Sequence, residues 1–245
     1  MIKGKLEQAT RLLLVNSLNL FNESVLIVEY PKSGGSWLGQ LVSNYLDIPF
    51  PRNEFPGLSR SVYHSHYKPS YLIPKNKKIL WLVRDGRDVY VSFYYHQLIW
   101  SNKNKLDPKT VTYTRKNLPF ADYNDISNNL PEYLDYSFTH KPSKSHYFNF
   151  PGDWASYNRQ WQDEVNAGNS NIHMVRYEDL LSNTEDALRH LLTSVFNVTV
   201  DEQKLKQVVE KFSFENQTKR KQGVEDTNSF LRKGIAGDWK NYFNE

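Results

Sequence analysis

The sequence predicts a single α/β domain over residues 1–245, with a central, mostly parallel β-sheet flanked by helices. One reason is that short apolar runs, typical of buried strands, alternate with segments of helical spacing. Another is length, since 245 residues suit one sizeable α/β domain and are few for two. The predicted strands are 25–30, 61–66, 79–83 and 172–175, and the predicted helices are 1–22, 37–46, 89–98, 153–167, 183–196 and 201–211. Because strands and helices alternate as βαβ units, ligands are expected at the carboxyl ends of the strands.

Composition excludes several classes of function. The chain has 31 basic and 27 acidic residues, and its net charge of +4 suits a small polyanionic ligand better than nucleic acid. It has no cysteine, which excludes disulfides, thiolate catalysis and cysteine-bound zinc and is compatible with a cytoplasmic location. No apolar run approaches the ~20 residues of a membrane span. Asparagines interrupt the segment 1–22, which therefore favours an amphipathic leading helix over a signal peptide.

The stretch 30–37, Tyr-Pro-Lys-Ser-Gly-Gly-Ser-Trp, joins the first predicted strand to the first core helix. Its two glycines let backbone N–H groups converge on an anion, the helix start adds a positive dipole, and Lys32 adds a full charge. A plain strand-to-helix turn would use the same glycines. A Walker A loop would place its lysine after the last glycine, whereas Lys32 precedes both Gly34 and Gly35. The sequence of an ordinary ATPase or kinase loop is therefore excluded.

Two further basic segments lie far along the chain, at 84–92 and 230–240. Arg84 comes directly after a predicted strand, and Ser92 is expected in the early part of the next helix, where both could share an anionic ligand. For Arg84, the alternative is a salt bridge with a nearby aspartate, Asp85 or Asp88. Asp88 is itself expected as a first-turn acid or cap of that helix.

Taken together and in this order, the three segments resemble those of the sulfotransferases that use 3′-phosphoadenosine 5′-phosphosulfate (PAPS). The stretch 30–37 matches their Tyr-Pro-Lys-Ser-Gly-Thr-Thr-Trp loop at six of eight positions. The segment 84–95 is similar to their Arg-x-x-(Lys/Arg)-Asp-x-x-Val-Ser-x-Tyr-Tyr segment, and 232–240 carries the whole of their Arg-Lys-Gly-x-x-Gly-Asp-Trp-Lys signature. The resemblance covers about residues 25–243 and implies an enzyme with a P-loop-like phosphosulfate-binding loop.

The resemblance implies that PAPS is the co-substrate and that two separated anion sites hold it. The 5′-phosphosulfate would be bound by Lys32, Ser33, Gly34 and Ser36. The 3′-phosphate would be bound by Arg84, Ser92, Arg232, Lys233 and Gly234, among which arginine offers bidentate geometry. Trp37 and Phe214 would stack on the two faces of the adenine, with Tyr177 near the base. For Trp37 and Phe214, the alternative is that the rings pack in the hydrophobic core. Gly35 stands where the family has threonine; because its backbone N–H is retained, altered cofactor affinity is expected rather than a lost site.

The resemblance further implies in-line transfer of the sulfuryl group to a hydroxyl or amine. Lys32, a compact cation, would stabilise the leaving 5′-phosphate. His66, which matches the histidine of a family Lys-(Thr/Ser)-His segment, would be the base, since neutral imidazole suits that role near pH 7. His64 stands where the family often has lysine, which weakens that lysine's supporting role here, and it could equally cap a strand. No metal is required, and a site built on the two histidines would need further ligands that the sequence does not identify.

The acceptor is expected to be a small molecule or sugar bound along the region 101–150, where rings such as Tyr94, Phe120 and Tyr123 could stack. A P-loop-type nucleoside-phosphate kinase and a non-catalytic nucleotide-binding module remain the alternatives. Dimers of the family often use a Lys-x-x-x-Thr-Val segment, but the residues after Lys240 lack the Thr-Val. A monomer, a homodimer through another surface and a truncated chain all remain open.

Overall fold

The computed structural model describes residues 9–10, 13–14, 16–17, 23–51, 59–71, 77–99, 108–139 and 152–243. Of the predicted leading helix at 1–22, the described residues before 23 are all helical, and the rest of that prediction lies outside the described residues. Contacts within the chain divide it into two compact units. The first unit contains residues 1–84 and 142–212, and the second contains residues 85–141 and 213–245.

Four parallel strands form the sheet of the first unit: β1 (Val25–Glu29), β2 (Val62–Ser65), β3 (Lys78–Val83) and β4 (Ile172–Arg176). Their order is β2-β1-β3-β4, and every neighbouring pair is parallel. The apolar run of β1 is buried at all of its positions, as expected for a strand covered on both faces. The predicted α/β class with a parallel sheet is confirmed, and the four carboxyl ends lie along one edge of the sheet.

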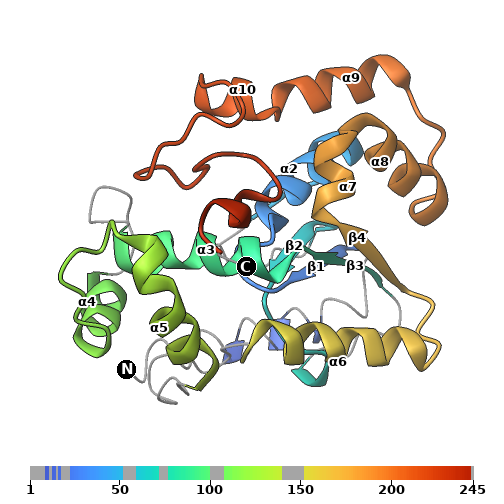
Figure 1. Cartoon of the computed structure of the whole chain (residues 1–245). Coiled ribbons are helices and arrows are strands. Elements are labelled where there is room, and N and C mark those ends of the chain that lie inside the picture. The colour runs from blue at the N-terminus through green and yellow to red at the C-terminus, as the bar shows by residue number, and fades with distance from the viewer. Residues whose placement is uncertain are drawn as a thin grey trace. The chain divides into compact units, whose positions relative to one another are not determined.

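Helices cover both faces of this sheet (Figure 1). On one face, α2 (Gly35–Leu46), α7 (Tyr177–Ser182), α8 (Thr184–His190) and α9 (Glu202–Lys211) share a core with Val25, Ile27, Leu80 and Leu82. On the other face lies α6 (Trp154–Asn166), where the indole N–H of Trp81 donates to Asn158 Oδ1 over 3.1 Å. Successive residues of a strand point to opposite faces, so the alternate positions of β3 serve both cores.

The second unit is built on α3 (Gly86–Tyr94), which continues as a π-helical turn at Tyr95–Ile99. Its other elements are α4 (Pro108–Asn117), α5 (Ile126–Thr139), α10 (Phe214–Thr218) and a 3₁₀ turn at Asp238–Asn241. Asp85 caps α3 by accepting the Arg87 N–H, while Asp88 is the first-turn acid. The Asp88 carboxylate accepts the backbone N–H groups of Gly237, over 2.7 Å, and Trp239, over 2.9 Å. It therefore attaches the C-terminal basic segment to α3.

Two parts of the second unit differ from the sequence expectation. In the region 101–150, for which the sequence indicated no helix of defined bounds, α5 is 14 residues long, with Pro131 inside it. The tail after residue 213 begins with the short helix α10, which no periodicity predicted. Residues 100–107 and 140–151 lie outside the described part of the chain. Among the described helices, none is both long enough and apolar enough to cross a membrane.

Candidate functional site

Each strand of the first unit ends next to at least one residue that the sequence singled out. The loop 30–34 follows β1, His66 follows β2, Arg84 follows β3 and Tyr177 follows β4. Because the strands are parallel, these positions lie at the same edge of the sheet, which is where open α/β sheets bind ligands.

The loop after β1 has a backbone shape that glycine makes accessible. Lys32 and Gly34 both have left-handed φ angles, of 73° and 107°. The Gly34 carbonyl starts α2 by accepting the N–H groups of Trp37, over 2.9 Å, and Leu38, over 3.2 Å. A Cβ atom at Gly34 would lie 2.8 Å from Cδ2 of Tyr177, so a larger residue would collide with that ring.

Ser33 carries an unusual polar atom within this loop. Its side chain is fully buried, and its hydroxyl has no hydrogen-bond partner among the described residues. Buried polar atoms are ordinarily paired, because an unpaired one costs about 1–3 kcal/mol. The hydroxyl is therefore suited to a ligand oxygen at the start of α2.

Arg84 connects the loop to the end of β4. Its guanidinium donates to the Lys32 carbonyl over 3.1 Å and lies 4.4 Å from the centre of the Tyr177 ring. Trp37 is 6.0 Å from that same ring, edge to face, and its indole N–H donates to the Phe212 carbonyl over 2.9 Å. The first unit therefore brings together the basic loop, Arg84, Trp37 and Tyr177, four features to which the resemblance assigns parts of PAPS.

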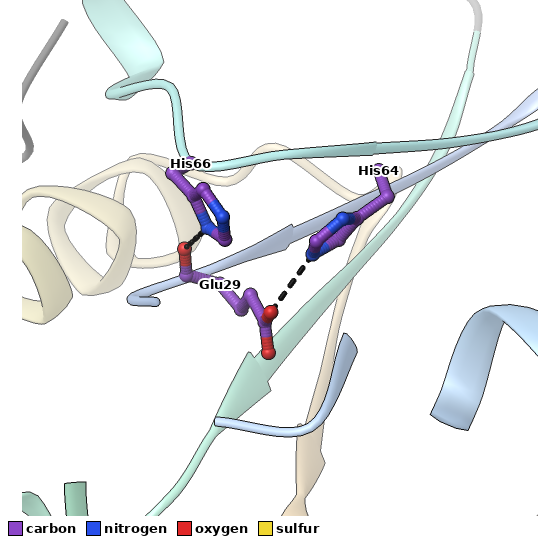
Figure 2. Close-up of side chains that lie close together, drawn as sticks. All are labelled: Glu29, His64 and His66. Atoms are coloured by element: carbon purple, nitrogen blue, oxygen red, sulfur yellow. Dashed lines mark hydrogen bonds and ion pairs between the residues drawn. The ribbon is translucent and has the colours of Figure 1, made fainter. Parts of the chain in front are cut away.

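His66 is held in the tautomer that a base requires. Its Nδ1 lies 3.0 Å from the backbone carbonyl oxygen of Glu29, as Figure 2 shows. A carbonyl can only accept, so Nδ1 carries the hydrogen and Nε2 keeps an unprotonated lone pair. Burial, and after it the nearby charge of His64, lowers the pKa of His66 to about 4. The ring is therefore neutral at pH 7.

Glu29 is the residue of this site that sequence reasoning missed. The residue is 3% exposed, and its carboxylate lies 2.8 Å from His64 Nε2 and accepts the Gly35 N–H over 2.5 Å. Burial alone would raise the pKa of Glu29, but the His64 hydrogen bond, both imidazoles and the Gly35 N–H lower it overall. The Gly35 N–H is thus retained, as expected, but it already donates to the Glu29 carboxylate. The sequence did contain one signal that could have identified Glu29, namely a carboxylate at the end of an otherwise apolar strand.

The same three side chains could also hold a cation. One ligand atom each from Glu29, His64 and His66 lies within 4.8 Å of the others. Two histidines with a carboxylate are a common ligand set for zinc and other transition metals. Glu29 supplies the third ligand that the sequence did not identify.

In the second unit, Arg232 and Lys233 of the segment 232–240 are paired with acids. The Arg232 guanidinium forms ion pairs with Glu225 and Asp238 and lies 4.2 Å from the centre of the Tyr95 ring. Lys233 Nζ lies 2.7 Å from the buried carboxylate of Asp238. Asp238 therefore fixes both cations, a contact that the sequence pattern alone did not predict.

Gly234 and Phe214 also lie together in this unit. Gly234 has φ 66°, and a Cβ atom there would lie 2.3 Å from a carbon of the Phe214 ring. Ser92 lies on α3, one helical turn after Asp88, whose carboxylate binds the backbone of the same C-terminal segment. The second unit thus contains Phe214 and all the residues predicted for the 3′-phosphate except Arg84, which belongs to the first unit.

The prediction that the Tyr94 ring could stack on an acceptor is wrong. Tyr94 is fully buried, and its hydroxyl donates to the Tyr123 carbonyl over 2.9 Å and accepts from Asn129 over 2.9 Å. Phe120 and Tyr123 are partly exposed. Tyr94 is therefore a core residue of the second unit.

The fold and this edge of the sheet define an α/β protein of the kind that binds ligands where parallel strands end. The sequence profile of the sulfotransferase domain family matches residues 52–245. The chain belongs to that family, and the expectation of a sulfotransferase is confirmed. The matched range contains Arg84, Tyr177 and the segment 232–240, while the loop 30–37 precedes it.

Individual relatives extend the similarity to most of the chain. Sulfotransferase 1B1 of Mus musculus is 26% identical over 89% of this chain and 77% of its own length. The crystal structure of mouse sulfotransferase SULT7A1, complexed with 3′-phosphoadenosine 5′-phosphate (PAP), has a TM-score of 0.66 at 18% identity, covering 96% of this chain and 83% of that one. Retinol dehydratase in complex with androsterone and inactive cofactor PAP has a TM-score of 0.57 at 16% identity, covering 94% and 79%. The solved structures share the fold.

Proposed function

We propose that this sulfotransferase moves the sulfuryl group of PAPS to a hydroxyl or amine of a small-molecule or sugar acceptor, with His66 as base. The observation that carries the proposal is the state of His66, whose Nδ1 is engaged by the Glu29 carbonyl so that Nε2 is open to accept a proton. The relatives named above are sulfotransferases, and solved members of this fold contain PAP, which supports PAPS as the co-substrate.

The residues of the first unit fit a phosphosulfate. The loop 30–37 carries Lys32 as a cation, the unpartnered hydroxyl of Ser33 and the amino end of α2, all of which favour bound anions. Ser36 lies in the first turn of that helix. The Gly35 N–H is engaged by Glu29, so we assign the phosphosulfate contacts to Lys32, Ser33, Gly34 and Ser36.

The residues of the second unit fit a separate phosphate. Following the resemblance, we assign the 3′-phosphate to Arg84, Ser92, Arg232, Lys233 and Gly234. Before a phosphate binds, Glu225 and Asp238 hold the two cations, Arg232 and Lys233, in place. A bound phosphate would compete with these carboxylates for the same cations. Trp37 and Phe214 are proposed to hold the adenine, with Tyr177 beside the base.

The proposed step runs in line. The acceptor oxygen or nitrogen forms a bond to sulfur while the bond from sulfur to the bridging oxygen of the 5′-phosphate breaks. The electron pair stays on that phosphate oxygen, where Lys32 stabilises the growing charge. The acceptor's proton moves to Nε2 of His66, the lone pair left open by the tautomer.

Calorimetric titration with PAP, PAPS and ATP tests the choice of nucleotide. We expect PAP and PAPS to bind at least 100-fold more tightly than ATP, because ATP lacks the 3′-phosphate that the second anion site requires. The Lys32→Ala variant should lose most transfer from PAPS. Tight ATP binding without PAP binding would instead favour a nucleoside-phosphate kinase or a non-catalytic nucleotide-binding module.

An acceptor screen with sulfur-labelled PAPS tests the second substrate. We propose that the acceptor binds along the region 101–150, near the partly exposed Phe120 and Tyr123. Transfer of label to a phenol, alcohol, amine or sugar identifies its class. A cytoplasmic location and the choice between monomer and homodimer stay predictions, as does catalysis without a metal ion.

A further inference from the structure

The Arg232 guanidinium has an acid on each of its two terminal nitrogens. Its Nη1 forms an ion pair with Glu225, and its Nη2 forms one with Asp238. Arginine binds a phosphate best through two parallel hydrogen bonds from neighbouring N–H groups. Because both nitrogens are engaged and only 11% of the side chain is exposed, such paired binding of a phosphate requires one of the two acids to withdraw.

Asp238 is fixed where it lies. Its side chain is 2% exposed, and besides Arg232 its carboxylate contacts Lys233 Nζ over 2.7 Å and accepts from the side-chain amide of Asn241 over 2.8 Å. A buried carboxylate that left these partners would keep the cost of burial and lose the groups that compensate it. Asp238 is therefore expected to stay on the cations when a phosphate binds.

Glu225 lies in a different environment. Its side chain is 31% exposed, so that its carboxylate reaches water by rotation of the side chain alone. Ion pairs that solvent reaches contribute little to stability, because water and salt ions replace the lost partner at small cost. Of the two acids on Arg232, Glu225 is therefore the one that can withdraw.

The backbone around Glu225 is held beside Arg232 by hydrogen bonds. The Arg220 guanidinium donates to the carbonyl of Val224, over 2.7 Å, and to the carbonyl of Arg232, over 2.8 Å. The N–H of Asp226 donates to the same Arg232 carbonyl over 2.9 Å. Both sequence neighbours of Glu225 are thus attached, so the loop presents this carboxylate to Arg232 whenever the cation is not bound to a ligand.

We propose that Glu225 is an internal competitor of the nucleotide's 3′-phosphate: its carboxylate pairs with Arg232 in the unliganded protein and is displaced by the phosphate, while Asp238 stays. The inference rests on the proposed function. Because displacement of Glu225 offsets part of the binding free energy, this residue weakens the binding of 3′-phosphorylated nucleotides and leaves the binding of other adenine nucleotides unchanged. It thereby limits how tightly the product PAP is retained after transfer.

Two variants and one control test the proposal. Glu225→Gln removes the charge at nearly constant shape, and Glu225→Asp keeps the charge. Glu215→Gln, at an exposed acid in the first turn of α10 in the same unit, is the matched control. Calorimetry measures the affinity for PAP and for adenosine 5′-phosphosulfate, which has no 3′-phosphate. The kcat and the KM for PAPS are measured beside thermal unfolding.

We expect Glu225→Gln to bind PAP about tenfold more tightly, because a neutral amide neither competes for Arg232 nor repels the phosphate. Its affinity for adenosine 5′-phosphosulfate should stay within about twofold of the wild type. The KM for PAPS should fall while kcat does not rise, since ground state and transition state gain the same contact. Glu225→Asp and Glu215→Gln should bind PAP within about threefold of the wild type. A residue that only supports the fold would not give tighter binding on substitution.

Two results would overturn this role while leaving the proposed function intact. The first is unchanged or weaker PAP binding by Glu225→Gln, and the second is an equal gain for both nucleotides. If Glu225→Gln does not fold, a crystal structure of the wild type with PAP decides: Glu225 still paired with Arg232 overturns the role, and Glu225 displaced with Asp238 in place supports it. If the wild type binds no PAP and transfers no label from PAPS, the proposed function fails and this role fails with it.

Discussion

The carboxylate of Asp88, in the first turn of α3, accepts the backbone N–H of Gly237 over 2.7 Å. It also accepts the N–H of Trp239, and the side chain is almost fully buried. Two residues nearly 150 positions apart are thereby joined, and with them the two basic segments that the sequence pattern marked. The Asp-x-x-Val-Ser and Gly-Asp-Trp portions of those segments are structural partners.

Asp88→Asn should reveal the strength of this attachment. The amide offers one acceptor oxygen instead of two and places an NH₂ group beside a backbone donor, so the free energy of unfolding should fall by about 1–3 kcal/mol. PAP affinity should fall as well, because the segment carrying Arg232 and Lys233 is held less firmly. Denaturant unfolding and calorimetry measure both. Asp163→Asn, on the exposed surface of α6, is the control, and an unchanged unfolding midpoint for Asp88→Asn would refute the attachment.

Arg232→Lys should weaken PAP binding about tenfold, because lysine cannot reproduce the two parallel hydrogen bonds of a guanidinium to phosphate. The affinity for adenosine 5′-phosphosulfate, which lacks the 3′-phosphate, should change less than threefold. Calorimetry with the two nucleotides measures the difference, and the exposed Arg159→Lys serves as control. Equal losses for both nucleotides would remove Arg232 from the 3′-phosphate site.

Gly35→Ala should destabilise the protein by about 1–3 kcal/mol, since the added methyl group overlaps the Glu29 carboxylate and the His64 ring. Glu29→Ala removes one of these obstacles. The double variant should therefore be at least ~1 kcal/mol more stable than the sum of the single effects predicts. Denaturant unfolding of the four proteins in this cycle provides the measurement. Additive effects would mean that Gly35 and Glu29 do not share the space that the structure gives them.

The pH dependence of stability reports on His66. Burial and the charge of His64 lower its pKa from 6.5 to about 4 in the folded protein, while Glu29 opposes them and Lys32 adds a smaller effect in the same direction as His64. Because the pKa of His66 is lowered in the folded protein, the contribution of His66 to the free energy of unfolding is fully present above about pH 6.5. That contribution is lost as the pH falls towards 4.

The wild type should accordingly lose about 2 kcal/mol more than His66→Gln between pH 7 and pH 4. Glu29 also loses its contribution on acidification, because its folded-state pKa is lowered too, but it is present in both proteins. Urea unfolding at half-unit pH steps measures the difference. Parallel pH curves for the two proteins would contradict the buried, neutral state of His66.

The sheet could be predicted from the sequence because its strands are local signals. The runs at 25–28 and 79–83 are apolar throughout, since both faces of a parallel sheet are covered, and their order with the helices implied βαβ connections. Segments whose residue types carry charge or backbone freedom, such as the loop 30–37, also stood out without any tertiary information.

Glu29 did not stand out, because its importance depends on strand register. Its strand lies beside β2, where Ile27 pairs with His64 and Val28 with Ser65, and this pairing brings the carboxylate to both histidines. Nothing within five residues of Glu29 in sequence indicates that neighbour. The ion pairs of Asp238 with Arg232 and Lys233 are local, but the sequence does not tell whether the cations face a ligand or an acid.

Helix α5 was missed for a different reason. Ile126, Leu130 and Tyr133 do recur at helical spacing and are buried. The intervening asparagines and Pro131 are residues typical of loops, and they obscured that spacing. Proline is tolerated here at the sixth position of the helix, so burial of the apolar face outweighed the local preference.

The central claim is that Nε2 of His66 receives the acceptor's proton during transfer from PAPS, and the turnover number of His66→Gln tests it most directly. Glutamine fills a similar volume but cannot act as a base, so kcat should fall about 10²–10⁴-fold while PAP affinity stays within about threefold. His190→Gln, on the exposed surface of α8, should match the wild type in both. A His66→Gln enzyme that turns over within a few-fold of the wild type would contradict the account.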